Sequence, residues 1–221
     1  MQIDDKPLAL VTGVGPGTGA AVARRFAAGG YRVAMLARNA DRLTALAAEI
    51  PDSIAVPCDV TDAAALEAAI SGIGAPKVVV HNAVGGAFGN FMDIDPAVLQ
   101  RNFDINTMAL LRLAQLTTPA MVSAGEGALI VTGNTSAQRG KAAFAGFAPT
   151  KAAQRILAES IARDLGPKGV HVAYLIIDAV IDVPWQRERL PDAKDDFFIH
   201  NRKSRINFRN FFEEQSLGTL P

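Results

Sequence analysis

The chain has 221 residues, enough for one domain with a substantial hydrophobic core. Lysine plus arginine and aspartate plus glutamate number 22 each, so the balance does not favour a polyanionic partner such as nucleic acid. The single cysteine, Cys58, excludes an internal disulfide and any multi-cysteine metal site. Because no leader and no apolar run long enough to cross a bilayer is found, we expect a soluble cytoplasmic protein without membrane contact.

The first apolar run, Leu8–Thr12, passes directly into a glycine-rich turn and then into residues with helical spacing. The turn contains four glycines: Gly13, Gly15, Gly17 and Gly19. This pattern predicts a buried strand, a tight turn and a helix N-terminus, where backbone N–H groups and the positive end of the helix dipole meet. A pyrophosphate can approach the glycines closely, so we predict a dinucleotide-binding unit; a bare structural turn is the alternative.

The second predicted strand, Tyr31–Ala37, ends at Arg38. In dinucleotide-binding folds an acidic side chain at this strand end bonds to the adenosine ribose, whereas a basic one pairs with a 2′-phosphate. Arg38 therefore favours NADP(H) over NAD(H) as the cofactor. The alternative is a solvated arginine that opens the helix predicted at Asp41–Ile50.

Two further strands are predicted at Ser53–Cys58 and Lys77–His81, each followed by candidate cofactor-binding residues. Asp59 and Val60 follow the first, and Asp59 is placed to hold the adenine amino group. Asn82 opens the turn after the second strand, on the ligand side of an open α/β sheet. The next helix, from Ala63 to about Ser71, is capped by Thr61 or Asp62.

A long helical stretch at Pro96–Ala124 carries Asn106 among apolar residues, and we expect a kink or interruption near Pro119. Asparagine is unfavourable inside a helix because its side chain competes for backbone hydrogen bonds. Asn106 is therefore a candidate site residue, with a satisfied core amide as the alternative. His81 is predicted to be a structural residue rather than a metal ligand, since the other histidines offer no ligand spacing.

The remaining elements complete an alternating pattern of strands and helices. Strands are predicted at Ala128–Thr132 and Val170–Ile177, with a helix between them that carries Lys151. This alternation predicts a single α/β domain with a doubly wound parallel sheet, the Rossmann-type three-layer α/β/α arrangement.

Taken together, the residues from about Leu8 to Pro184 resemble the short-chain dehydrogenase/reductase family. The resemblance rests on the Thr12–Gly19 turn, Asp59-Val60, His81-Asn82-Ala83-Val84-Gly85, Asn106 and Lys151. It implies hydride transfer between NAD(P)H and a small carbonyl or alcohol substrate, with a tyrosine as general acid and base. The lysine lowers that tyrosine's pKa and holds the nicotinamide ribose, a serine orients the substrate, and an asparagine positions a relay water. It also implies a homodimer or homotetramer built on the fourth and fifth helices.

The sequence departs from this family at the catalytic positions. Phe147 stands four residues before Lys151, where the family has its tyrosine, and phenylalanine has no proton to give. Asn134 stands at the serine position; it can donate a hydrogen bond but cannot pass on a proton as a hydroxyl does. We therefore assign Lys151, Asn106, Asn134 and Phe147 to the catalytic site, with a non-standard proton route.

Lys151 is the leading candidate for the proton donor, with solvent and Asp178 as other sources. A lysine buried near a cationic nicotinamide can have a pKa near neutrality, whereas a solvated surface lysine is the alternative. Tyr174 lies in mid-strand, where a core role is predicted. A catalytically silent NADP(H)-binding sensor or assembly protein is the alternative function for the whole chain.

The composition divides the chain into three segments. Residues 1–183 form the predicted dinucleotide-binding domain, and residues 184–199 form a lid on the substrate side. Residues 200–221 contain neither alanine nor valine, unlike the alanine-rich chain before them, and are predicted to be an irregular tail.

Overall fold

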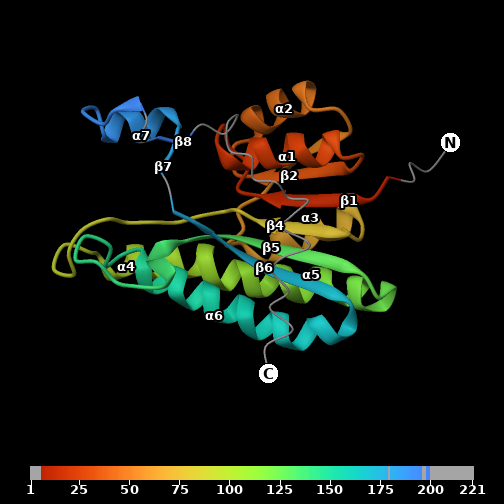
Figure 1. The fold of residues 1–221 in the computed structure, drawn as a ribbon. Coiled ribbons are helices and arrows are strands. Elements are labelled where there is room, and N and C mark those ends of the chain that lie inside the picture. The colour runs from red at the N-terminus through yellow and green to blue at the C-terminus, as the bar shows by residue number, and fades with distance from the viewer. Residues whose placement is uncertain (1–5, 179, 196–197, 200–221) are drawn as a thin grey trace.

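The computed structural model describes residues 6–178, 180–195 and 198–199, so the predicted tail at 200–221 lies outside the described residues. One sheet dominates the fold, with its strands in the order β3-β2-β1-β4-β5-β6 and every pair parallel (Figure 1). Its strands are β1 (Leu8–Thr12), β2 (Arg32–Ala37), β3 (Ser53–Pro57), β4 (Val78–His81), β5 (Gly127–Asn134) and β6 (Val170–Ile177). The strand order reverses between β1 and β4, which confirms the predicted doubly wound sheet.

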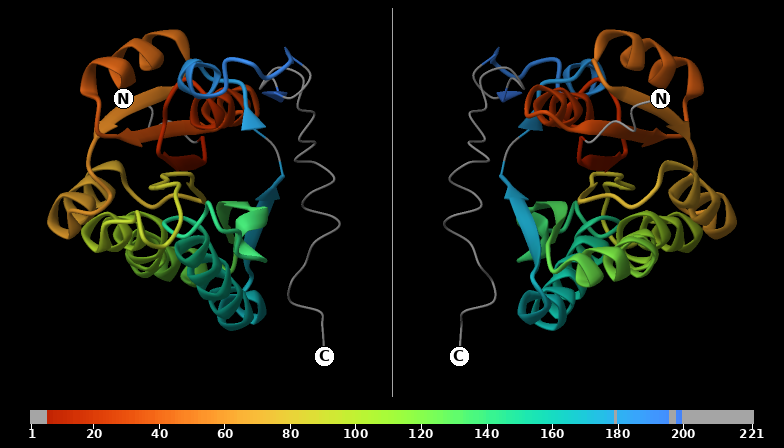
Figure 2. Two further views of the ribbon diagram at one scale, coloured as in Figure 1. Left: turned by 90° about the vertical axis from the view of Figure 1, so that its left-hand side faces the viewer. Right: turned by 90° about the vertical axis from the view of Figure 1, so that its right-hand side faces the viewer.

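Helices cover both faces of the sheet in three layers (Figure 2). One face carries α1 (Thr18–Ala28) and α2 (Ala40–Glu49), and the other carries α3 (Ala63–Ile73), α5 (Ala109–Ala124) and α6 (Ala148–Leu165). The short helix α4 (Pro96–Phe103) precedes α5. This is the predicted Rossmann-type arrangement, with predicted element ends one or two residues from the observed ones.

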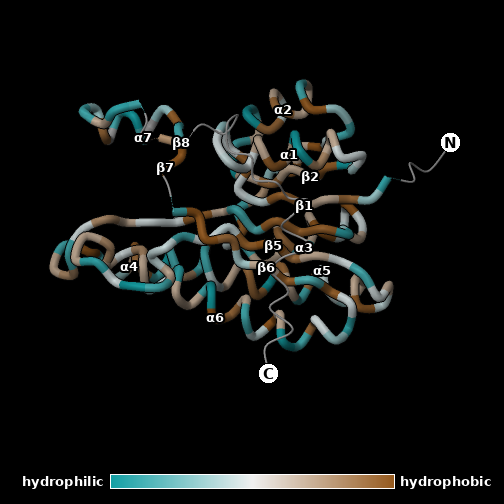
Figure 3. The backbone as a smooth tube through the Cα atoms, viewed as in Figure 1, coloured by the Kyte–Doolittle hydropathy of each residue, from teal (hydrophilic) through white to brown (hydrophobic). Residues whose placement is uncertain are grey.

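Two hydrophobic cores hold the layers together, one on each side of the sheet. Along β1, Leu10 packs into the core beneath α3 and α5, whereas Val11 packs into the core beneath α1 and α2. Successive strand residues point to opposite faces, so a strand covered on both sides must be apolar throughout. Figure 3 shows the result, a hydrophobic band along the central strands.

The helical stretch after Pro96 is interrupted at Asp104–Met108, not at Pro119 as predicted. Residues Asp104–Met108 form a π-helical turn, in which the N–H of Ala109 donates to the carbonyl of Asp104 five residues earlier. Helix α5 continues through Pro119 because this residue and Gln115, whose carbonyl loses its helical donor, both lie on the exposed side. Water can then satisfy that carbonyl.

The segment after β6 lies above the carboxyl ends of the first strands and is coloured blue in Figure 1. It contains β7 (Val180–Ile181), α7 (Pro184–Arg189) and β8 (Phe198–Ile199), with β7 and β8 paired in parallel. Arg187 joins Asp182 and Asp195 through ion pairs at 2.6 and 2.7 Å. No helix among the described residues has the length and apolar character needed to span a membrane.

Candidate active site

An open groove of about 1110 Å³ lies at the carboxyl ends of the strands and extends under segment 181–188. Its lining includes eight of the nine residues predicted to bind the cofactor: Gly13, Gly15, Gly17, Gly19, Arg38, Asp59, Val60 and Asn82. The ninth, Lys151, is not part of this lining. The fold therefore brings the predicted nucleotide-binding residues together from the ends of four strands, at the edge where open α/β sheets bind ligands.

The glycine turn between β1 and α1 has no room for larger residues at two positions. Gly13 has a φ of +66°, and a Cβ there would lie 2.4 Å from the Cα of Ala83. A Cβ at Gly19 would lie 2.7 Å from the carbonyl oxygen of Gly13. No side chain caps the N-terminus of α1 at Gly17, which leaves its first N–H groups for a ligand. The turn thus fits a pyrophosphate.

We expect Gly13→Ala to lower the free energy of unfolding by at least about 2 kcal/mol and to abolish nucleotide binding. The left-handed φ and the backbone contact at Ala83 both oppose a methyl group. Gly15→Ala is the matched control for stability, because a Cβ at Gly15 meets nothing within 4 Å. Thermal unfolding measures the loss of stability and calorimetric titration with NADPH measures the loss of binding, and equal stability of the two variants would contradict this account of the turn.

Two arginines line the groove at the end of β2. Arg38 follows the strand, and Arg42 stands in the first turn of α2, where Asn39 caps the helix by accepting the N–H of Arg42 at 2.8 Å. Sequence reasoning missed Arg42. The available sign was a basic residue at a helix N-terminus, where the dipole favours acidic residues. Two guanidinium groups here suit an additional phosphate.

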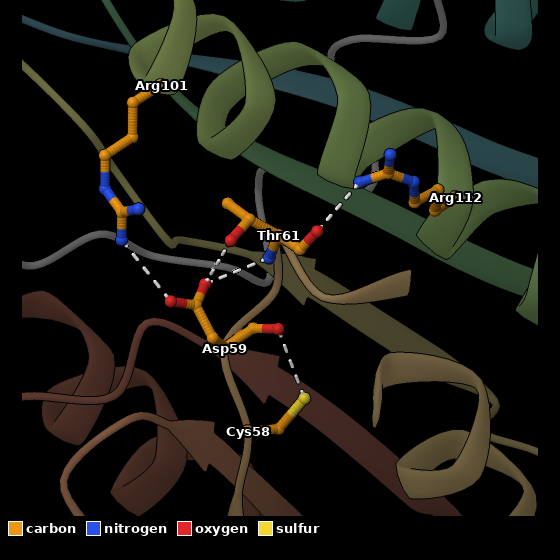
Figure 4. A network of polar contacts seen from close by, with 5 residues as sticks. All are labelled: Cys58, Asp59, Thr61, Arg101 and Arg112. Atoms are coloured by element: carbon orange, nitrogen blue, oxygen red, sulfur yellow. Dashed lines mark hydrogen bonds and ion pairs between the residues drawn. The ribbon is translucent and has the colours of Figure 1, made fainter. Parts of the chain in front are cut away.

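Asp59, predicted to hold the adenine, is engaged in a local network (Figure 4). Its Oδ1 accepts the N–H and the hydroxyl of Thr61 at 3.0 and 2.8 Å, and its Oδ2 lies 3.4 Å from Arg101. Burial acts to raise the pKa of Asp59, but the Thr61 hydrogen bonds and the charges of Arg101 and Arg38 outweigh it and lower the pKa. The carboxylate is therefore ionised at neutral pH and fixes the turn before α3, whose cap is the neighbouring Asp62.

Asn82 lines the groove while its side chain ties the strand ends together. Its Nδ2 donates to the carbonyl of Gly13 at 2.9 Å, and its Oδ1 accepts the hydroxyl of Thr132 at 3.2 Å. Next to it, His81 is fully buried with Nδ1 3.1 Å from the hydroxyl of Thr12, and burial, followed by the charge of Lys151, lowers its pKa to about 4. His81 is thus neutral at physiological pH. The described residues hold no cluster of potential metal ligands.

Lys151 is buried in the first turn of α6, so the alternative of a solvated surface lysine is wrong. Its Nζ lies 2.9 Å from the carbonyl oxygen of Thr132 and 2.5 Å from Oε1 of Gln154. Burial disfavours the charged ammonium and lowers the pKa of Lys151 to about 7. A lysine with this pKa can both donate and accept a proton near neutral pH.

The side chain of Asn106 is a buried amide whose hydrogen bonds are all made within the protein, which was the alternative to a role as a site residue. Its Oδ1 accepts the N–H of Gly85 at 3.0 Å, and its Nδ2 donates to the carbonyl of Gly85 and to the hydroxyl of Thr150, both at 2.8 Å. The backbone carbonyl of Asn106, within the π-helical turn, accepts from Nε2 of Gln154 at 2.7 Å. Sequence reasoning missed Gln154, although its i+3 spacing from Lys151 places both on one helix side.

Asn134 ends β5, and its side chain contacts neighbouring backbone. Nδ2 donates to the carbonyl of Ile177 at 3.0 Å, and Oδ1 accepts the N–H of Ser136 at 2.8 Å. The hydroxyl of Thr135, between them in sequence, donates to Asp178 at 3.0 Å. These bonds join the carboxyl ends of β5 and β6.

Phe147 is nearly buried within an aromatic cluster at the start of α6. Its ring centroid lies 5.5 Å from that of Phe88, which in turn makes an edge contact with Phe144 at 5.2 Å. A Cβ at Gly86 would lie 3.0 Å from the Phe147 ring. The position where the resembled family has its tyrosine is therefore apolar.

Tyr174 offers no substitute for that tyrosine. Its hydroxyl donates to the backbone carbonyl of Lys151 at 3.2 Å, and its ring occupies the space beside Gly133. Burial raises the pKa of Tyr174 to about 12, so the hydroxyl stays protonated at neutral pH. This agrees with the predicted structural role.

Comparison with known proteins identifies relatives that cover most of the chain. The sequence model of the short chain dehydrogenase family matches residues 7–192. D-erythrulose reductase of Gallus gallus is 33% identical over 165 residues, which cover 74% of this chain and 67% of the relative. The 7alpha-hydroxysteroid dehydrogenase of Escherichia coli K12 is 28% identical over 214 residues, or 93% of this chain and 83% of the relative.

A solved structure of the same family also has a similar fold. A short-chain dehydrogenase from Sphingobium yanoikuyae in complex with NADPH matches with a TM-score of 0.83 and 27% identity. The match covers 94% of this chain and 84% of that chain. The similarity thus extends over most of both molecules.

Proposed function

Because this chain belongs to the short-chain dehydrogenase family, we propose that the protein is an oxidoreductase that uses NADP(H) with a small carbonyl or alcohol substrate. The observation that carries the proposal is the groove, in which the glycine turn, Arg38, Asp59 and Asn82 meet at the carboxyl edge of the sheet. The glycine turn would hold the pyrophosphate. Arg38 and Arg42 would pair with the 2′-phosphate, which NAD(H) lacks.

Lys151 would supply or accept the proton of the reaction. When bound, the nicotinamide nucleotide supplies or takes up the hydride. In carbonyl reduction the substrate oxygen gains a proton as the hydride adds to carbon, and the Lys151 ammonium would become the neutral amine. Two of the three ammonium N–H groups bond to Thr132 and Gln154, so one is left for this transfer. A pKa of about 7 lets both forms exist at neutral pH.

Asn134 and the aromatic cluster would orient the substrate. One amide hydrogen of Asn134 donates to Ile177, and the second would donate to the substrate oxygen. Phe147 and Phe88 would contact the apolar part of the substrate from the side of the loop after β4.

Arg38 tests the choice of nucleotide. We expect Arg38→Ala to weaken NADPH binding by about 10- to 100-fold, the effect of losing one charge-assisted contact, and to leave NADH binding unchanged. Calorimetric titration of the variant with both nucleotides measures this. Arg163→Ala is the matched control, because Arg163 is exposed on α6 and pairs with Glu159. Equal weakening for both nucleotides would contradict the assignment of Arg38 to the 2′-phosphate.

A further inference from the structure

A buried chain of hydrogen bonds links Lys151 to the π-helical turn, and Gln154 is its central member. Oε1 of Gln154 accepts from Nζ of Lys151, and Nε2 donates to the carbonyl of Asn106 at 2.7 Å. Gln154 has no exposed surface, and Lys151 is 2% exposed. We propose that Gln154 is a positioning residue of the active site, whose side-chain amide fixes the ammonium group of Lys151 and ties it to Asn106.

The π-helical turn provides the acceptor for this arrangement. Within the π-helical turn at Asp104–Met108 the N–H of Ala109 donates to the carbonyl of Asp104, and Asn106 lies inside this turn. Gln154 uses the carbonyl of Asn106, and the Asn106 side chain holds the loop at Gly85 and the hydroxyl of Thr150. The position of the Lys151 ammonium is thereby coupled to the loop after β4 and to the first turn of α6.

The orientation of the Gln154 amide has a direct chemical consequence. Its nitrogen donates to a carbonyl, which cannot donate in return, so its oxygen must face Lys151. That oxygen stabilises the protonated form of Lys151 against the burial that disfavours it. Gln154 therefore opposes desolvation and keeps Lys151 able to take up a proton near neutral pH, a role that rests on the proposed function.

The test replaces the amide by groups of similar size. Gln154→Met removes the acceptor, and we expect the titration midpoint of Lys151 to fall by about one pH unit or more. Gln154→Glu places a negative charge beside Nζ, and we expect the midpoint to rise by a similar amount. Gln115→Met, on the exposed side of α5, is the matched control and leaves the midpoint unchanged.

The midpoints are measured by nuclear magnetic resonance on the full chain with ¹³C-labelled lysine side chains, and Lys151→Met identifies the signal. Shifts in opposite directions for the two Gln154 variants support the inference, because a purely structural defect would not change sign. If either variant fails to fold, the direction of the shift in the other decides. An unchanged midpoint in the folded variants overturns it.

A second readout separates this inference from the proposed function. The pH profile of NADPH oxidation with a carbonyl substrate is recorded for the wild type and for both variants. If the Lys151 midpoint shifts in the Gln154 variants but none of the three proteins oxidises NADPH, the result supports the role of Gln154 and argues against the proposed oxidoreductase activity. An active enzyme whose profile and midpoints are the same in all three proteins overturns the role of Gln154 alone.

Discussion

Phe147→Tyr is expected to raise the kcat of carbonyl reduction by about 10²-fold or more, the usual contribution of a positioned general acid. Position 147 lies four residues before Lys151 at the start of α6, so the two side chains stand on the same side of the helix. A tyrosine hydroxyl there would add the proton donor that the aromatic cluster lacks. The rate of NADPH oxidation over a panel of ketones and aldehydes measures the gain.

Phe144→Tyr is the matched control, since Phe144 belongs to the same cluster but precedes the helix. We expect this variant to keep the wild-type rate. The account would be contradicted if Phe147→Tyr bound NADPH normally and still showed no gain on any substrate, because the catalytic position would then lie elsewhere.

Lys151→Met is expected to lower kcat by about 10²- to 10⁴-fold, again the range of general acid–base catalysis. The pH dependence of the wild-type reaction rate should also report the titration of Lys151. Carbonyl reduction requires the protonated ammonium, so its rate should fall as the pH rises above about 7. Alcohol oxidation requires the neutral amine, so its rate should fall as the pH drops below about 7.

The Lys151→Met variant should also lose the change of rate near pH 7. Neither His81, with a pKa of about 4, nor Tyr174, with a pKa of about 12, titrates in that range. Lys168→Met provides the control, because Lys168 is exposed beyond the end of α6 and pairs with Asp164. A Lys151→Met variant with the wild-type rate and profile would exclude Lys151 as the proton donor.

The sequence predicted the sheet and the nucleotide groove because both depend on local patterns. Each of these patterns can be recognised within about ten residues of sequence. They are apolar strands such as Leu8–Thr12, glycines at fixed spacing, and the basic residue Arg38 at a strand end. The right-handed crossover of βαβ units then sets which face of the sheet each connecting helix covers. The groove forms because the carboxyl ends of these parallel strands meet at one edge of the sheet.

The network around Lys151 was not predictable in the same way. Gln154 bonds to the carbonyl of Asn106, which lies 48 positions earlier in the chain and within a π-helical turn. The turn has no marker of its own in the sequence, and Pro119, the visible helix breaker, lies elsewhere. Likewise, the pattern placed Asn82 at the groove but gave no indication that its side chain would bond to Gly13 and Thr132.

Calorimetric titration of the wild-type protein with NADPH and with NADH tests the central claim most directly. The glycine turn and the two arginines of the groove predict micromolar binding of NADPH and weaker binding of NADH. Binding of neither nucleotide would contradict the account, because the groove would then share only its fold with the dinucleotide sites it resembles.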